Sequence, residues 1–81
     1  MTKLIKFGTP ECASCVTLSN HLNDLGIKVD EEIHPFNNPE LAGKYNIGSI
    51  PVLILEDENG NEIQRSIGFK PNEIEEIIEQ L

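Results

Sequence analysis

Two cysteines three positions apart, Cys12 and Cys15, are the residues of this chain whose types and spacing point most directly to chemistry. They follow the largely apolar run 4–7 and open a helical pattern, so Cys12 is predicted to stand at a helix N-terminus. Unpaired backbone N–H groups and the helix dipole at such a terminus favour a thiolate over a thiol. Cys15 follows about one helical turn later on the same face, within reach of a disulfide. We therefore interpret Cys12 as the nucleophile and Cys15 as the resolving thiol of a redox centre.

The same Cys-x-x-Cys spacing serves as half of a zinc site, so a metal-binding or interaction module is an alternative interpretation. His21 and His34 would complete the ligand set. However, Cys12 and His21 would lie about 13 Å apart along one helix, which is too far for one tetrahedral site. We expect neither a metal nor a cofactor, and we expect both histidines at the surface or its boundary.

The composition of the chain limits its binding partners and the cellular compartment in which we expect it. The chain has 81 residues, with 14 acidic and 6 basic side chains and a net charge of −8. Such a charge repels nucleic acid and anionic membranes. No apolar stretch approaches the ~20 residues of a membrane helix, and the lysines near the N-terminus interrupt any leader pattern. We expect one soluble domain over residues 1–81, monomeric and cytoplasmic, with redox-active and not structural cysteines.

The first half of the chain predicts a strand–helix–strand unit. Residues 4–7 form the first strand and residues 8–10 a loop into the cysteine helix. Apolar residues then recur at helical spacing until Gly26, which is a typical helix stop: Leu18, Leu22 and Leu25. A second strand is expected within residues 27–33, parallel to the first.

The second half predicts a short helix, a hairpin and a terminal helix. Asn38 and Pro39 are a capping residue and a first helical residue, with the helix running to Lys44. The apolar run 51–55 suits a central strand, and an Asn-Gly turn leads to an antiparallel edge strand over 62–67. Beyond position 70, apolar residues at helical spacing predict a last amphipathic helix: Ile74, Ile77, Ile78 and Leu81.

This order of elements resembles the thioredoxin superfamily. The segments that carry the resemblance are residues 9–15 around the cysteines, 38–45, 48–51 and 68–69. The resemblance implies an α/β thioredoxin fold, a four-stranded mixed sheet (βαβ then ββα) flanked by three helices. It also implies a thiol–disulfide oxidoreductase that reduces protein disulfides and is recharged by an external reductase.

The resemblance further implies a substrate-binding region around Ile50, Pro51 and Gly68. In the family, the residue matching Pro51 is a cis proline against the active-site disulfide, and the backbone of the residue matching Ile50 pairs with an extended substrate segment. Proline suits this position because an X-Pro bond tolerates the cis form and offers no N–H donor beside the sulfurs.

Several residues depart from the family pattern. Thioredoxins carry Trp-Cys-Gly-Pro-Cys, whereas this chain has Glu11 before the first cysteine, Ala13 and Ser14 between the pair, and no tryptophan. Thioredoxins also place a buried acid on the first strand, where this chain has Lys6. Two interpretations of Lys6 stay open: an ammonium that favours the thiolate, or a strand lysine whose amine reaches solvent.

Glutaredoxins are the alternative within the same superfamily. They usually carry Thr-Val-Pro and a Gly-Gly-acid segment that binds glutathione, where this chain has residues 49–51 (Ser-Ile-Pro) and 68–70 (Gly-Phe-Lys). The likeness is closer to small bacterial and phage redoxins. We therefore expect a thioredoxin reductase-type flavoprotein as electron donor and disulfide-containing proteins as substrates, with ribonucleotide reductase one candidate.

Overall fold

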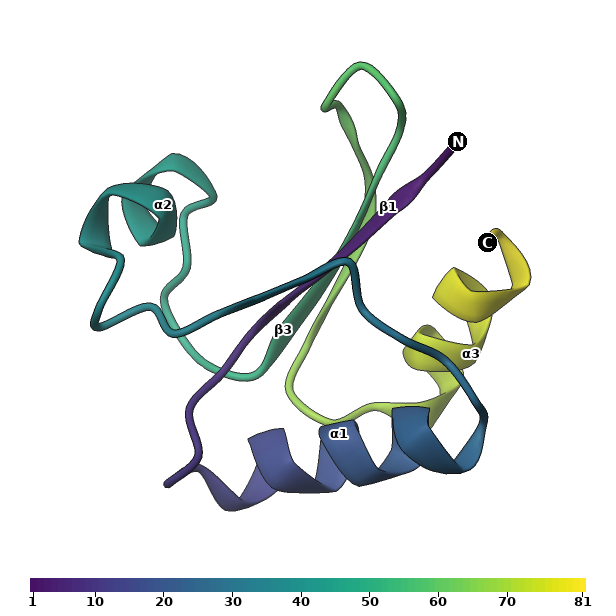
Figure 1. Ribbon diagram of the computed structural model, residues 1–81, viewed down its shortest axis with the longest axis horizontal. Helices are drawn as coiled ribbons and strands as arrows, with labels where there is room; N and C mark the ends of the chain where they lie inside the picture. Colours follow the sequence, from purple (N-terminus) through teal and green to yellow (C-terminus); the bar gives the residue numbers. More distant parts are fainter.

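The computed structural model describes all 81 residues and contains seven regular elements, with four strands and three helices in the predicted order (Figure 1). Their bounds are β1 Lys3–Phe7, α1 Ala13–Asp24, β2 Glu31–Ile33, α2 Pro39–Lys44, β3 Val52–Glu56, β4 Glu62–Ile67 and α3 Pro71–Glu79. The predicted fold class is confirmed.

The strands form one mixed sheet in the order β2-β1-β3-β4. β1 pairs with β2 in parallel, and β3 pairs antiparallel with both β1 and β4. The continuous apolar run in β3 is explained by its central position, since its residues are buried on both faces of the sheet. The prediction of a parallel first unit, a central third strand and an antiparallel edge strand is therefore confirmed.

Helices cover both faces of the sheet, with α1 and α3 on one side and α2 on the other (Figure 1). Successive strand residues point to opposite faces, so the apolar residues divide into two cores. The core under α1 and α3 contains Leu4, Leu18, Leu22, Leu53, Leu55, Ile74 and Ile77. The core under α2 contains Ile5, Phe7, Ile33, Val52 and Ile54.

The second strand is shorter than predicted. Residues 27–30 lie outside β2, although Ile27 and Val29 still pack against the core under α1 and α3. The Asp30 carboxylate accepts the Leu4 N–H at 2.7 Å, and the Asp30 N–H donates to the Leu4 carbonyl oxygen at 2.8 Å. The Asp30 side chain thus takes the place of a ladder carbonyl, and β2 begins only at Glu31.

Helix termini differ from the sequence expectation in three details. Asn38 precedes α2 as predicted, but its side-chain amide donates to the His34 carbonyl oxygen and makes no bond to the helix it precedes. Leu25 and Leu81, expected on apolar helix faces, are 53% and 52% exposed because α1 and α3 end before them. Gly26 ends α1 as predicted, with a φ of 71° that favours glycine.

A polar network connects α2 to the sheet. The Tyr45 hydroxyl, just after α2, donates to the Glu56 carboxylate at 2.7 Å, and the Tyr45 ring lies 5.4 Å from that of Phe7. Arg65 donates to the Tyr45 carbonyl oxygen at 2.8 Å and to the Glu62 carboxylate at 2.6 Å. Glu56 is only 6% exposed, so the tyrosine hydroxyl satisfies a buried carboxylate.

Candidate active site

The strand register brings the site residues predicted from the sequence to the same end of the sheet, where β1, β2 and β4 end and β3 begins. Phe7, Ile33 and Ile67 end β1, β2 and β4, and each pairs directly or through one intervening strand with Val52, the first residue of β3. The segments that follow β1 and β4 and the one that precedes β3 therefore meet here. They carry the cysteines, Gly68 and the pair Ile50–Pro51, respectively.

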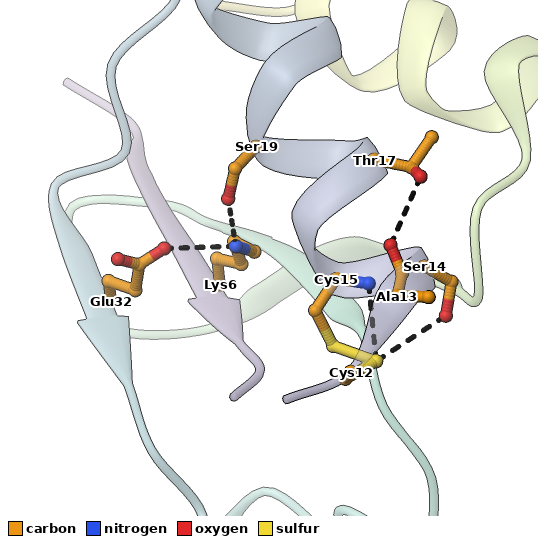
Figure 2. Close-up of a disulfide and its surroundings, with 8 residues drawn as sticks. All are labelled: Lys6, Cys12, Ala13, Ser14, Cys15, Thr17, Ser19 and Glu32. Atoms are coloured by element: carbon orange, nitrogen blue, oxygen red, sulfur yellow. Dashed lines mark hydrogen bonds and ion pairs between the residues drawn. A yellow bond between two sulfur atoms is a disulfide. The ribbon is translucent and has the colours of Figure 1, made fainter. Parts of the chain in front are cut away.

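Cys12 and Cys15 form a disulfide at the start of α1, with their Cα atoms 5.2 Å apart (Figure 2). Cys12 is the N-cap of the helix, with extended backbone, and its sulfur accepts the Cys15 N–H at 3.2 Å. A sulfur in this position receives a helix N–H that would otherwise have no partner. The predicted placement of the pair at a helix N-terminus is thus observed.

The two cysteines differ in exposure. Cys15 is 1% exposed, whereas Cys12 is only partly buried. The Ser14 hydroxyl lies 3.4 Å from the Cys12 sulfur, and Figure 2 shows it on the side of the disulfide away from Lys6. Of the two residues, Cys12 is the one that an incoming disulfide can reach.

Gly8 leaves the space that the buried sulfur occupies. A Cβ at position 8 would lie 3.1 Å from both the Cβ and the Sγ of Cys15. Real Cβ atoms rarely approach other atoms so closely, so a side chain here would displace the cysteine. Gly8 is therefore required by the close approach of strand end and helix.

The Ile50–Pro51 peptide bond is cis, and Pro51 is buried. The Gly68 N–H donates to the Pro51 carbonyl oxygen at 2.8 Å, and the positive φ of Gly68, 84°, suits a residue without a side chain. Neither the N–H nor the carbonyl oxygen of Ile50 has a hydrogen-bond partner within the chain. Ile50 thus offers free backbone groups at the edge that carries the disulfide.

Lys6 is buried, which excludes the interpretation that its amine extends into solvent. The residue is 4% exposed, and its amine donates to the Glu32 carboxylate at 2.9 Å and to the Ser19 hydroxyl (Figure 2). These residues line a cleft of about 350 Å³ whose wall also includes Cys15 and His34. Neither Glu32 nor Ser19 was predicted from the sequence to belong to the site. The one available signal was a lysine inside an apolar strand.

The two histidines contact different aromatic rings, and His34 also lines the cleft that Cys15 lines. The His21 ring contacts the Phe69 ring edge-on at 5.4 Å, and the His34 ring contacts that of Phe36 at 5.8 Å. No group of three or more His, Cys, Asp or Glu side chains is arranged to hold a metal ion. No helix is long and apolar enough to span a membrane.

Comparison with known proteins agrees with this geometry. The chain is 38% identical over 79 residues to the SPbeta prophage-derived thioredoxin-like protein YosR of Bacillus subtilis, covering 98% of each. It is 34% identical over 82 residues to thioredoxin of the same bacterium, covering 93% of this chain and 77% of the relative. The chain belongs to the thioredoxin superfamily. No protein-family model matches it.

Solved thioredoxin structures share the fold. The reduced thioredoxin pre-protein of Schistosoma mansoni superposes with a TM-score of 0.82 at 22% identity, covering 98% of this chain and 77% of the other. Oxidised mitochondrial thioredoxin 3 of Saccharomyces cerevisiae gives a TM-score of 0.81 at 22% identity, covering 99% and 78%. The chain thus matches 77% and 78% of the length of these two thioredoxins and shares their architecture over that part.

Membership and geometry together establish the chemistry. A thioredoxin-like chain that carries a Cys-x-x-Cys pair joined as a disulfide is a thiol–disulfide oxidoreductase. The glutaredoxin alternative gains no support, because the curated relatives that this chain matches are thioredoxins and a thioredoxin-like protein.

Proposed function

We propose that this thioredoxin-like protein reduces disulfides of other proteins, with Cys12 as the nucleophile and Cys15 as the resolving thiol. The observation that carries the proposal is the difference between the two cysteines: a partly exposed Cys12 at a helix N-cap is disulfide-bonded to a buried Cys15. An intermolecular disulfide can form at the first sulfur, and the second then displaces the substrate from within the protein.

The reaction exchanges one disulfide for another. The Cys12 thiolate attacks one sulfur of the substrate, forming a mixed disulfide, and the substrate's other sulfur leaves as a thiolate that takes up a proton from water. Cys15 then attacks Cys12, which releases the second substrate thiolate and forms the Cys12–Cys15 disulfide. The substrate gains two electrons and the protein loses two, so a reductase must return them.

Substrate docking is assigned to Ile50, Pro51 and Gly68. The free N–H and carbonyl groups of Ile50 support pairing with an extended segment of the substrate, as in other cases where a peptide adds to exposed backbone. Pro51 has no N–H to offer there, and the Gly68 N–H supports the turn by bonding the Pro51 carbonyl oxygen. This role for Gly68 is indirect, because its own donor is already used.

For the electron donor we propose a thioredoxin reductase-type flavoprotein rather than glutathione, and a cytoplasmic setting in which dithiols stay reduced. The segments 49–51 and 68–70 lack the glutathione-binding pattern, and a net charge of −8 does not attract an anionic tripeptide. Ribonucleotide reductase is one candidate among the substrate proteins.

A turnover assay tests the proposal. Its substrate is a protein such as insulin, which precipitates when its disulfides are reduced. The oxidised protein is supplied with NADPH and thioredoxin reductase in one arm, and with NADPH, glutathione and glutathione reductase in the other. We expect faster turnover in the first arm at matched enzyme concentrations. Faster turnover in the second arm would make the protein a glutaredoxin in function, and no turnover in either arm would reject protein disulfides as substrates.

A further inference from the structure

Lys6 is the one buried ammonium beside the redox pair, and the mechanism described so far does not use it. We propose that Lys6 is a positioning residue for the resolving step, in which its charge stabilises the thiolate of Cys15. This inference rests on the proposed function, because it assigns a helper to the thiol that closes the disulfide.

The distances to Gly8 place the lysine near the buried sulfur. A Cβ atom added to Gly8 would lie 3.1 Å from Cys15 Sγ and 3.5 Å from Lys6 Cε. The sulfur and this carbon, which carries the amine, can therefore be no further apart than the sum of those two distances. Both residues are almost completely buried, so their interaction is screened less than one between two surface groups.

The lysine is held in place from two elements. Its amine donates to Ser19 on α1 and to Glu32 on β2, at 2.9 Å from the carboxylate (Figure 2). The aliphatic stem passes beneath Gly8, where a side chain would touch it. The ammonium therefore lies in the wall of the cleft, hydrogen-bonded to α1 on one side and to β2 on the other.

The charged and titratable groups around the cleft leave the positive charge dominant at Cys15. Glu32 opposes Lys6, but its side chain is 59% exposed against 6% for the lysine, so water screens the carboxylate more strongly. His34, after β2, also lines the cleft; α1 contributes only Ser19, Val16 and the sulfur, and the loop 8–10 contributes no charge. Glu11, the other nearby acid, is exposed and lies outside the cleft wall.

The step assisted is the second one. Cys15 gives its proton to water in the open cleft, and the thiolate, paired electrostatically with the Lys6 ammonium, attacks Cys12 in the mixed disulfide. The bond between Cys12 and the substrate sulfur breaks, and that sulfur leaves with the electron pair. The lysine neither gains nor loses a proton, so the electron and proton balance of the reaction is unchanged.

Titration of Cys15 alone gives a readout that does not depend on activity. In a Cys12→Ala background, the pH midpoint of thiolate absorbance is measured for four further substitutions, one of which, His34→Gln, is a control for the other titratable residue in the cleft wall. Lys6→Met, which keeps the stem and removes the charge, should raise the midpoint by about 1 pH unit. Lys6→Arg should stay near the parent, and Glu32→Gln should lower the midpoint, because it removes the opposing charge.

Kinetics of the resolving step give a second readout. A mixed disulfide between Cys12 and thionitrobenzoate is prepared in the full two-cysteine protein, and release of the coloured thiol is followed in a single turnover. At neutral pH, Lys6→Met should lower the thiolate fraction about tenfold, while the more basic thiolate attacks about threefold faster, so release slows by about threefold. At a pH above the Cys15 midpoints of both proteins, Cys15 is a thiolate in each. Release from Lys6→Met should then be faster than from the parent, because its thiolate is more basic.

The signs of these changes decide between charge and packing. Opposite shifts for Lys6→Met and Glu32→Gln, with arginine restoring the lysine value, support the inference. Equal midpoints, shifts of the same sign, or a shift caused by His34→Gln alone would overturn it. Glu32 is largely exposed, so its substitution keeps the test valid if the lysine variant folds poorly. Loss of turnover in the wild type would reject the proposed function, whereas the titration would still test the lysine.

Discussion

Cys12 and Cys15 differ in exposure because the helix turns between them. The first is the N-cap and faces outward, while the second begins the buried side of α1, above Gly8. Two chemically identical side chains thereby take different places in the proposed reaction. Each cysteine can be tested by removing one sulfur atom at a time.

Serine substitutions should separate the two steps. Cys12→Ser should abolish disulfide reduction, because the attacking thiolate is gone. Cys15→Ser can still attack and should accumulate mixed disulfides, because only the release step is lost. Non-reducing electrophoresis and mass spectrometry after incubation with oxidised insulin would detect the trapped species. Equal trapping by both variants would contradict the assigned roles.

Gly8→Ala should destabilise the oxidised protein by about 1–3 kcal/mol, because the added methyl group meets Cys15 at 3.1 Å. The matched control is Gly43→Ala in α2, where the new methyl group meets nothing within 4 Å beyond its chain neighbours and the helix's own backbone. This control should stabilise by about 0.5–1 kcal/mol, because alanine is the better helix former. Denaturant unfolding of both variants measures the difference. The same sign for both would show that crowding at Gly8 is not the cause.

At the scale of elements, α2 depends on a polar connection to the sheet. The helix has only six residues and none of them is buried, so little apolar burial holds it. Tyr45 supplies the connection, through its ring against Phe7 and its hydroxyl on Glu56. Because the segment after α2 leads to Ile50, this connection also supports the proposed docking region.

Tyr45→Phe should cost about 1–3 kcal/mol at neutral pH, because it leaves the buried Glu56 carboxylate without its donor. Burial and the hydrogen bond to Glu56 raise the pKa of Tyr45 from 10.0 to about 12. A raised pKa means that the stabilisation is complete below pH 10 and is lost as the pH rises from 10 to about 12.

The predicted effect of Tyr45→Phe is checked by measuring the free energy of unfolding against pH for the wild type and the variant. The wild type should lose stability through that alkaline window, and Tyr45→Phe should lose less, so the two curves should approach each other. Parallel curves would show that the hydroxyl does not titrate in the folded protein at this pH. A neutral-pH cost near zero would show that Glu56 finds another donor.

At the scale of the whole molecule, the excess of negative charge opposes compactness. The 14 acidic side chains outnumber 6 basic ones, and α3 alone carries Glu73, Glu75, Glu76 and Glu79 with no basic residue in its last turn. The ion pairs are few and mostly between exposed groups, such as Lys3 with Glu31. Repulsion among surface carboxylates should therefore outweigh the attraction within these pairs.

Added sodium chloride should stabilise the protein, because salt at about 0.1 M screens charges beyond about 10 Å. Thermal unfolding at increasing salt measures the effect, with potassium chloride as a check on ion identity. A variant carrying Glu76→Lys and Glu79→Lys should show a weaker salt dependence, since both sites are exposed and the excess charge falls. A falling melting temperature with salt would mean that the ion pairs dominate instead.

Local patterns determined most of the element order. The apolar run in β3, the helical spacing in α3 and the glycine after α1 are signals within a few residues, and each predicted element is present. The cysteine pair was likewise readable, because a helix N-terminus is a local feature. The start of β2 was predicted too early, because the Asp30 side chain, and not the strand pattern, decides where the ladder begins.

The rest of the site depended on the tertiary structure. Lys6 lies in the chain far from Ser19 and Glu32, and only the pairing of β1 with β2 beneath α1 closes all three around one cleft. Gly68 meets Pro51 only because β4 pairs with β3 in one register. The sequence by itself thus specified which residues could react and on which elements they stand. The burial of a charge and the neighbours of a sulfur arise from long-range strand pairing, which no local pattern encodes.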